Sequence, residues 1–402
     1  MRYFGSLLIA LNCLVFVLAQ ARDDNLRGPA FMAQAQKGFE QIYSLDYDDA
    51  FRTFSNLKSQ YPRHPAPPVY LATVIWLREL FERNELNLDH FIAPGYFTQP
   101  SPQKMAPADR KLFMDYLKEC ETLCRAILDK DPDNIDARYF LGSMYGIRGA
   151  FAITIDRSYR EAFSKGKKAY EHHLKITEED PSFNDAYMSV GLYEYIVDNL
   201  PWYIKWIAVM VGYRGSEERG FEYLNRAAEK GIYAADDARV LQMVLYVREK
   251  RFDEALNNVR ILRDKYPRNF VLHINQAYIL EKMAKKDLAA AEYRQVLHFA
   301  ESQKPNYQKI PLPSFRLTAA RKLLSLADYD SALVQFQTGM NQPGLPEGQK
   351  ALAHLGAGQA LDALGRRQEA IRQYQAVLEF PEIDDSHSKA RRLISRPYNG
   401  AK

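Results

Sequence analysis

Residues 236–269 read DDARVLQMVLYVREKRFDEALNNVRILRDKYPRN. Apolar residues recur at helical spacing, pause at 250–252 and recur again as far as Pro267, which indicates two helices joined by a tight turn. The next 34 residues repeat the pattern, with Ala289 lying 34 positions after Ala255. A period of this length predicts a chain built from stacked helix pairs.

Certain positions of the repeat hold the residue types that such a pair needs. Small residues let its two helices approach closely, larger ones fill the space against the next pair, and proline ends the second helix. The first repeat has Gly38, Ala50, Phe54, Leu57 and Pro62, the fifth has Ala255, Val259, Leu262 and Pro267, and the eighth has Gly358, Ala370, Tyr374 and Val377. In this pattern the chain resembles a tetratricopeptide-repeat (TPR) protein. The resemblance implies an all-α, right-handed superhelical solenoid of about eight helix pairs.

We expect the solenoid to occupy residues 22–384. Its helix pairs are expected near 30–64, 66–133, 134–182, 183–234, 235–269, 270–304, 311–346 and 347–384. The polar, helix-capable segment 385–402 is expected to cap the open end of the stack, because a single repeat cannot bury its own apolar face.

The N-terminus has the pattern of an export signal. Arg2 precedes a mostly apolar run at 4–18, and the small-residue site Ala19-Gln20-Ala21 follows before polarity rises. This pattern predicts a cleavable signal peptide at 1–21 and a mature chain that is periplasmic or secreted. An uncleaved anchor helix is the alternative, although the run is short for a membrane span.

Insertions separate the two helices of repeats two to four, within 84–107, 148–161 and 197–214. The first is rich in proline and predicts a loop. The third contains the apolar run 200–213 with Trp202 and Trp206, which predicts an extra core helix. The alternative is a segment that docks a partner or contacts a membrane surface, which we do not favour.

A narrower likeness covers about 40 residues of the fourth repeat. The segments 191–193 (GLY), 200–201 (LP), 211–216 (VGYRGS) and 219–221 (RGF) are similar to the corresponding part of the tetratricopeptide repeat 39 (Iml2-like) family. That family is not typically exported, so the signal sequence is a departure, and its cellular roles are not carried across.

Few residues of the chain suggest chemistry. Cys120 and Cys124 occupy core positions of one helix, and we expect buried thiols, with a strained disulfide as the alternative. Neighbouring His172 and His173 point in different directions and are expected to be surface or partly packed residues. The lysines of 165–168 are expected on a solvated helix face.

The sequence therefore predicts neither an enzyme nor a nucleic-acid binder. Phosphate loops, dinucleotide-binding loops and nucleophile elbows are missing from it, and no metal site or cofactor is expected. The 54 basic and 50 acidic residues give a net charge of +4, whereas nucleic-acid binders concentrate positive charge.

We expect the function to reside on the concave face, which the first helix of each pair lines in TPR solenoids. The corresponding residues are Phe39, Tyr43, Trp76, Tyr139, Leu192, Tyr195, Val244, Arg248 and Tyr278. Because aromatic residues give large contact areas, this face predicts a non-catalytic scaffold that binds protein or peptide partners. The alternative is an enzyme or small-ligand carrier with a site formed by the insertions. The superfamily's carboxylate clamp needs Asn at repeat position 9, where this chain has residues such as Tyr278 and Arg321.

Overall fold

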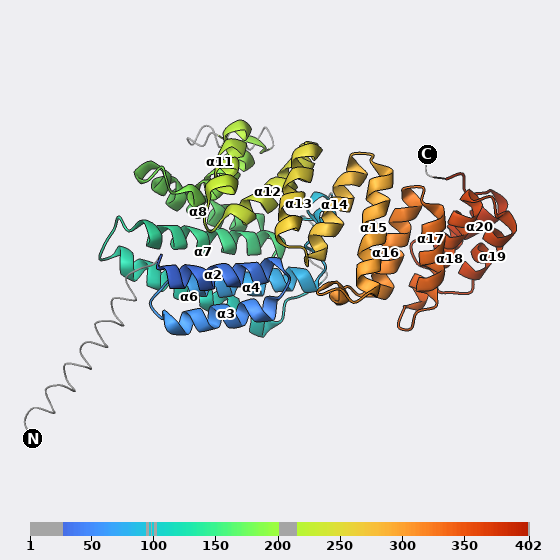
Figure 1. Ribbon diagram of the computed structural model, residues 1–402, viewed down its shortest axis with the longest axis horizontal. Coiled ribbons are helices and arrows are strands. Elements are labelled where there is room, and N and C mark those ends of the chain that lie inside the picture. The colour runs from blue at the N-terminus through green and yellow to red at the C-terminus, as the bar shows by residue number, and fades with distance from the viewer. Residues whose placement is uncertain (1–26, 94–95, 98, 100–102, 201–214, 401–402) are drawn as a thin grey trace, which may run out of the picture. The chain divides into compact units, whose positions relative to one another are not determined.

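The computed structural model describes residues 27–93, 96–97, 99, 103–200 and 215–400. These residues form eighteen α-helices and two 3₁₀ helices, and no strand occurs among them. The expectation of an all-α fold built from helix pairs is confirmed (Figure 1). The expected signal peptide at 1–21, Trp202 and Trp206 lie outside the described residues.

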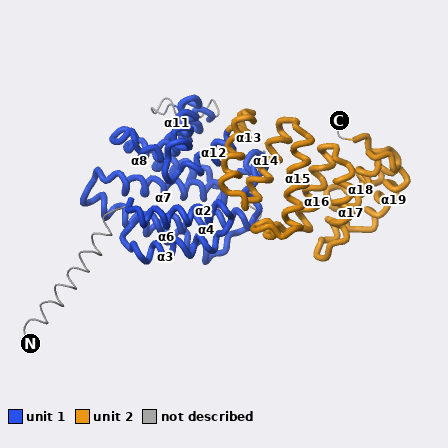
Figure 2. Tube along the Cα trace, viewed as in Figure 1, with its two compact units in different colours: residues 1–245 blue, residues 246–402 orange. Residues whose placement is uncertain are grey.

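Contacts divide the chain into two compact units, residues 1–245 and 246–402 (Figure 2). The helices that begin in unit 1 are α2 (Pro29–Tyr43), α3 (Tyr47–Gln60), α4 (Ala66–Glu82), α5 (Leu88–Ile92), α6 (Pro107–Leu128), α7 (Ile135–Thr154), α8 (Tyr159–Glu179), η1 (Asn184–Ala186), α9 (Tyr187–Asp198), α11 (Glu217–Lys230) and α12 (Ala235–Arg248). The helices of the first four pairs pack against each other, α2 on α3, α4 on α6, α7 on α8 and α9 on α11, and α4 also packs against α7, the first helix of the next pair.

Unit 2 continues the same organisation. It contains α13 (Phe252–Lys265), α14 (Phe270–Lys282), α15 (Lys286–Glu301), η2 (Tyr307–Lys309), α16 (Leu312–Ser325), α17 (Tyr329–Met340), α18 (Glu347–Ala363), α19 (Arg367–Val377) and α20 (Ser386–Ser395). Here α16 packs against both α17 and α18, and α20 packs against α18 and α19. The C-terminal segment therefore covers the last helix pair.

Local sequence signals fix where many helices begin. Asn134, Ser158, Ser216 and Asn269 precede α7, α8, α11 and α14, and their side-chain oxygens accept a backbone N–H of the first turn. Such a cap stabilises a helix by about 1 kcal/mol. Proline lies in the first turn of α2, α4 and α6, where no intrahelical donor is lost.

The small residues of the repeat lie where the pattern requires them. A Cβ added at Gly38 would lie 2.3 Å from the Phe54 ring, and one added at Gly358 would lie 2.4 Å from the Tyr374 ring. Ala255 is fully buried in the fifth pair. In both units the two helices of a pair therefore approach each other closely at the small positions of the repeat.

The first two insertions differ in form. The second lengthens α7 and α8 to 20 and 21 residues instead of forming a separate loop. The first contains the short helix α5 and is attached to the α7–α8 turn, where Arg157 lies over the Tyr96 ring at 3.8 Å and pairs with Glu85 at 3.1 Å. The expectation that the first insertion is a loop is therefore only partly correct. The third falls largely outside the described residues.

A membrane-spanning helix needs about 20 consecutive, mostly apolar residues. Within the described parts of the chain, no helix combines that length with that apolar character.

Candidate partner-binding site

The first helix of each pair, here called the A helix, was expected to present a binding face. In unit 1 the A helix α2 carries Phe39 and Tyr43, both half-buried. The Phe39 ring packs edge-on against Phe54 and Tyr70, with centroids 5.5 and 4.8 Å away. The Tyr43 hydroxyl donates a hydrogen bond to Asp237. Side chains of the same unit thus contact both residues.

Further contacts hold α2 to segments far away in the sequence. The Tyr233 hydroxyl contacts the Met32 sulfur at 3.1 Å, and the Tyr233 ring stacks on Tyr139 with centroids 5.7 Å apart. Just before α2, Arg27 forms an ion pair of 2.7 Å with Asp136 at the start of α7. The A-helix side of unit 1 is therefore occupied in large part by contacts within the unit.

Two aspartates, Asp185 and Asp237, accept hydrogen bonds that hold these segments of unit 1 together. Asp185 is buried and accepts hydrogen bonds from the backbone N–H groups of Tyr233 and Ala234, at 2.7 and 2.8 Å. Partial desolvation, together with Asp236 and Asp185, raises the pKa of Asp237 to about 6, while the Tyr43 hydroxyl acts in the opposite direction. Because Asp237 is still accessible to water, its effect on stability is smaller than the pKa alone suggests.

Three of the expected face residues are buried. Tyr139, Tyr195 and Tyr278 expose 6%, 1% and 8% of their surfaces. Tyr195 packs against Phe221, and Tyr139 stacks on His173 with centroids 5.1 Å apart. Neighbouring rings of unit 1 therefore cover Tyr139 and Tyr195, Tyr278 in unit 2 is buried as well, and the role of all three in binding stays a prediction.

The other expected face residues are more accessible. Trp76 is half-buried, and its indole N–H donates to the Thr154 hydroxyl at 2.8 Å. Leu192 and Val244 are half-buried, and Arg248 is exposed beside Glu249. Trp76 is the only aromatic residue of these four, and their role in binding stays a prediction.

The thiols have the features of core residues. Cys120 and Cys124 are fully buried and unbridged, with their sulfur atoms 3.9 Å apart. The hydrogen bond to Cys124 and burial both raise the pKa of the Cys120 thiol, which disfavours the reactive thiolate.

The paired histidines have different environments. His173 is buried against Gly142, its Nε2 lies 2.9 Å from the Tyr139 carbonyl oxygen, and burial lowers its pKa to about 4. The expectation of a partly packed residue is therefore wrong for His173, because Gly142 leaves room for its ring. His172 is half-buried and stacks on Tyr145.

The lysines of 165–168 lie along α8, and two of them approach the Tyr145 ring from 5.0 and 5.7 Å. Lys167 pairs with Glu171 one turn later, at 3.5 Å. These contacts fit a solvated helix face.

A buried polar cluster lies in unit 2 around His273. Its Nδ1 is 2.9 Å from the Tyr307 hydroxyl, and its Nε2 is 2.6 Å from Glu292, which also accepts from Arg263 and Gln276. Burial lowers the pKa of His273 although Glu292 favours the charged form. A neutral ring that donates from Nε2 to Glu292 and accepts from Tyr307 satisfies both nitrogens, so the cluster joins α13, α14, α15 and η2 without a free nucleophile.

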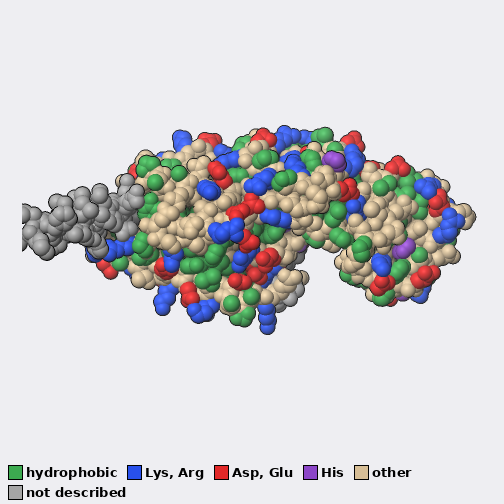
Figure 3. Space-filling view, turned by 60° about the horizontal axis from the view of Figure 1, so that its bottom comes forward, with side chains coloured by type: hydrophobic (Ala, Val, Ile, Leu, Met, Phe, Trp, Pro, Cys, Tyr) green, Lys and Arg blue, Asp and Glu red, His purple; other side chains and the backbone are tan. Residues whose placement is uncertain are grey.

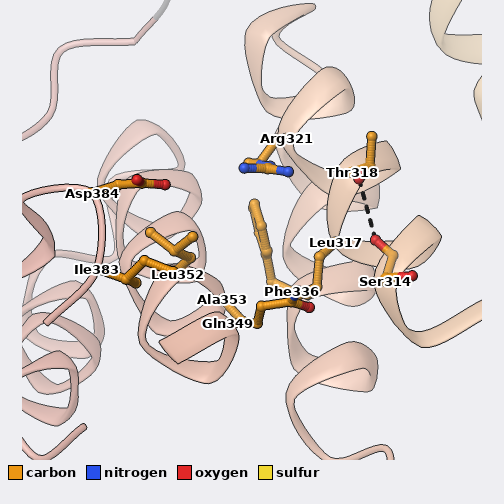
Figure 4. A pocket seen from close by; sticks show the side chains of 10 residues that line it. All are labelled: Ser314, Leu317, Thr318, Arg321, Phe336, Gln349, Leu352, Ala353, Ile383 and Asp384. Atoms are coloured by element: carbon orange, nitrogen blue, oxygen red, sulfur yellow. Dashed lines mark hydrogen bonds between the residues drawn. The ribbon is translucent and has the colours of Figure 1, made fainter. Parts of the chain in front are cut away.

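An open A-helix face remains in unit 2, where α16 and α18 border a cavity of about 240 Å³ (Figure 4). Leu317, Phe336, Leu352, Ala353 and Ile383 supply its apolar lining. Two exposed, oppositely charged side chains, Arg321 on α16 and Asp384 before α20, flank its mouth.

Polar groups complete the wall of this cavity. Ser314 and Thr318 are exposed on successive turns of α16, and Gln349 lies on α18. Next to Arg321 in the chain, Lys322 pairs with Glu281 of α14 at 3.1 Å. We call Glu281, Ser314, Thr318, Arg321, Lys322 and Leu352 the A-helix face of unit 2.

Sequence reasoning found only part of this face. Arg321 was recognised as the residue at repeat position 9, and the α16 periodicity could have placed Ser314 and Thr318 beside it. Asp384 could not be found in this way, because it lies in the turn between α19 and α20, where the repeat pattern has no marked position.

Two further observations bear on the kind of site. Among the residues that the structure describes, no group of three or more His, Cys, Asp or Glu side chains could hold a metal ion. Acidic and basic side chains are interspersed on the surface shown in Figure 3 and do not gather by sign. On that face the structure shows no basic tract of the kind that binds nucleic acids.

No family model and no curated protein matches the chain. Solved structures that resemble it include yeast Tom70 (13% identity, 91% of this chain and 95% of that one, TM-score 0.33). Others are a tetratricopeptide repeat protein from Parabacteroides merdae (14%, 82% and 99%, 0.32) and the human IFIT1 dimer with PPP-AAAA (13%, 91% and 84%, 0.36). At these scores and identities the likenesses carry no argument about partners, and the tetratricopeptide repeat 39 likeness remains a local resemblance.

Proposed function

We propose that this TPR-type chain is an exported, non-catalytic scaffold that binds segments of protein partners through the A-helix face of unit 2. The observation that carries the proposal is the contrast between the two units. Side chains of unit 1 cover much of its own A-helix side, whereas unit 2 presents exposed Ser314, Thr318 and Arg321 around an apolar cavity.

The composition of this face supports a protein ligand. Its hydroxyls, apolar lining and charges of both signs match a polypeptide, which offers apolar side chains and charged groups together. The even mixture of charges on the surface of Figure 3 gives no corresponding support to a nucleic acid. The signal-like sequence at 1–21 supports the proposed export.

The described residues also support a non-catalytic role. Both cysteines in them are buried, and the His273 cluster has its polar groups paired internally. Where the first two insertions meet, the Arg157–Glu85 and Arg148–Asp156 ion pairs occupy the junction. This arrangement favours a structural role for these insertions over a site of an enzyme or carrier.

Site-specific photocrosslinking tests the proposal. A photoreactive residue replaces Thr318 on the A-helix face, and in a control variant it replaces Val334, which is 54% exposed on the second helix α17. After export in the native host, we expect a discrete crosslinked protein from position 318 and none from position 334. Equal labelling at both positions, or labelling at neither, would contradict the proposal.

A further inference from the structure

We propose that the cavity between α16 and α18 binds a free apolar α-amino acid, which goes beyond the scaffold function. Arg321 would bind the α-carboxylate, Asp384 the α-ammonium group, and the apolar lining the side chain. Figure 4 shows Arg321 and Asp384 on opposite sides of the mouth, above Phe336 and Leu352.

The two charges are available for a ligand. Arg321 and Asp384 are exposed, and within the described part of the chain neither side chain forms an ion pair, including with the other. A guanidinium can bind a carboxylate through two parallel hydrogen bonds, and a carboxylate accepts hydrogen bonds from an ammonium group. A zwitterion would satisfy both charges at once.

The floor of the cavity is fixed by packing. The Phe336 ring lies over Gly356, where an added Cβ would be 2.2 Å from the ring, and a Cβ added at Gly339 would be 2.8 Å from Leu317. Both side chains are buried. They form a fixed floor beneath half-buried Leu352 and Ile383, which are the apolar side chains that a ligand would contact, so binding does not have to order the floor.

The acidic side of the mouth is also preformed. Asp384 lies in a turn with a left-handed backbone (φ 49°), a conformation that Asp tolerates. Ser386 closes this turn, since its N–H donates to the Ile383 carbonyl at 2.9 Å and its hydroxyl accepts from the Ile383 N–H at 3.2 Å. The Lys389 ammonium donates to the Asp384 carbonyl oxygen at 2.6 Å, so the turn is held in place while the carboxylate stays free.

Size and charge together select the ligand class. At about 240 Å³ the cavity is smaller than the roughly 300–1,000 Å³ typical of cofactor and drug-sized sites. An internal residue of a peptide has neither an α-carboxylate nor an α-ammonium group, and a terminal residue has only one of them. A free amino acid with an apolar side chain has both charges and a small apolar group.

Isothermal titration of the chain from residue 22 with L-leucine and L-phenylalanine tests this assignment. We expect saturable one-site binding to at least one of them. N-acetyl-leucine, which lacks the ammonium group, and leucinamide, which lacks the carboxylate, should each bind at least fivefold more weakly. No saturable binding of either amino acid, or equal binding of the derivatives, would overturn the assignment.

Variants locate the site and its two contacts. Arg321→Ala should weaken leucine binding at least fivefold but change leucinamide binding little. Asp384→Ala should also weaken leucine binding at least fivefold but change N-acetyl-leucine binding little. Arg372→Ala, which removes an exposed arginine of α19 outside the cavity, is the matched control and should leave leucine binding unchanged.

Circular dichroism confirms that each variant is folded. Leucine binding that both cavity variants leave intact would place the site elsewhere and overturn the proposal. Tighter binding of a blocked peptide than of leucine would also overturn it. Crosslinking at position 318 without amino-acid binding would sink this inference and leave the proposed scaffold function standing.

Discussion

The packing of the third helix pair makes opposite predictions for two glycines of unit 1. Gly142 in α7 faces His173, and a Cβ added there would lie 2.4 Å from the His173 ring atoms Cδ2 and Nε2. At Gly166 in α8, an added Cβ would have no atom within 4 Å of it. Gly142→Ala should therefore destabilise the unit, whereas Gly166→Ala should stabilise it.

The magnitudes follow from these contacts. Carbon atoms pack at about 3.5–4.0 Å, so the His173 ring must move by about 1 Å in Gly142→Ala. The ring is buried and 2.9 Å from the Tyr139 carbonyl oxygen, so this shift adds a weakened hydrogen bond of about 1 kcal/mol to an overpacking cost of about 1–3 kcal/mol. Replacing a helical glycine by alanine raises the free energy of unfolding by about 1 kcal/mol through helix propensity. We expect a net loss of roughly 1–3 kcal/mol at Gly142 and a gain of about 0.5–1 kcal/mol at Gly166.

Urea unfolding followed by tryptophan fluorescence measures both effects, since all three tryptophans lie within residues 1–245. The loss caused by Gly142→Ala should shrink when His173→Ala removes the clashing ring, which a double-mutant cycle detects. If Gly142→Ala and Gly166→Ala shift the urea midpoint in the same direction, the described contact between α7 and α8 is wrong.

Three further predictions concern other parts of the chain. Ala255→Leu should overpack the fifth pair and lower the free energy of unfolding by roughly 1–3 kcal/mol, and an unchanged melting temperature would refute the repeat register. Burial lowers the pKa of His173 to about 4, so its neutral ring contributes roughly 3 kcal/mol to the free energy of unfolding above pH 6.5, and this contribution should be lost as the pH falls from 6.5 through 4. His273, whose pKa is also lowered, acts in the same direction. Urea titrations at several pH values that show no such decline would contradict this. Trp202→Ala with Trp206→Ala should greatly reduce the melting temperature if these rings are core residues, whereas normal melting with lost partner or lipid binding would favour a docking segment.

The fold was largely predictable because its signals are local and repeated. Gly38 and Gly358 are small because each faces a ring of its partner helix, and Ala255 is small and fully buried. The 34-residue spacing from Ala255 to Ala289 made the register visible. Proline and Asn or Ser caps then set many helix starts. The second insertion was harder, because a longer gap between marks does not distinguish a loop from two lengthened helices.

The candidate site was less predictable, since it depends on contacts that cross repeats. Repeat position alone assigned Tyr139 and Tyr195 to an open face, although neighbouring rings cover them. Arg321 and Asp384 flank the mouth of the unit 2 cavity although they lie 63 residues apart in the chain (384 − 321). Arg321 belongs to helix α16, whereas Asp384 belongs to the turn between α19 and α20. A repeat pattern carries no information about such a pair.

The two units also use the same helix type in different ways. In a simple solenoid each repeat contacts only its neighbours, so the A helices form one continuous open face. Unit 1 departs from this rule, because Tyr43 of the first pair bonds to Asp237 of the fifth and Tyr233 packs on Tyr139 of the third. Such contacts couple distant repeats and favour rigidity over access. In unit 2 the A helices α16 and α18 meet the polar turn at Asp384 and leave a cavity between them, so the same repeat produces a closed A-helix side in unit 1 and an accessible one in unit 2.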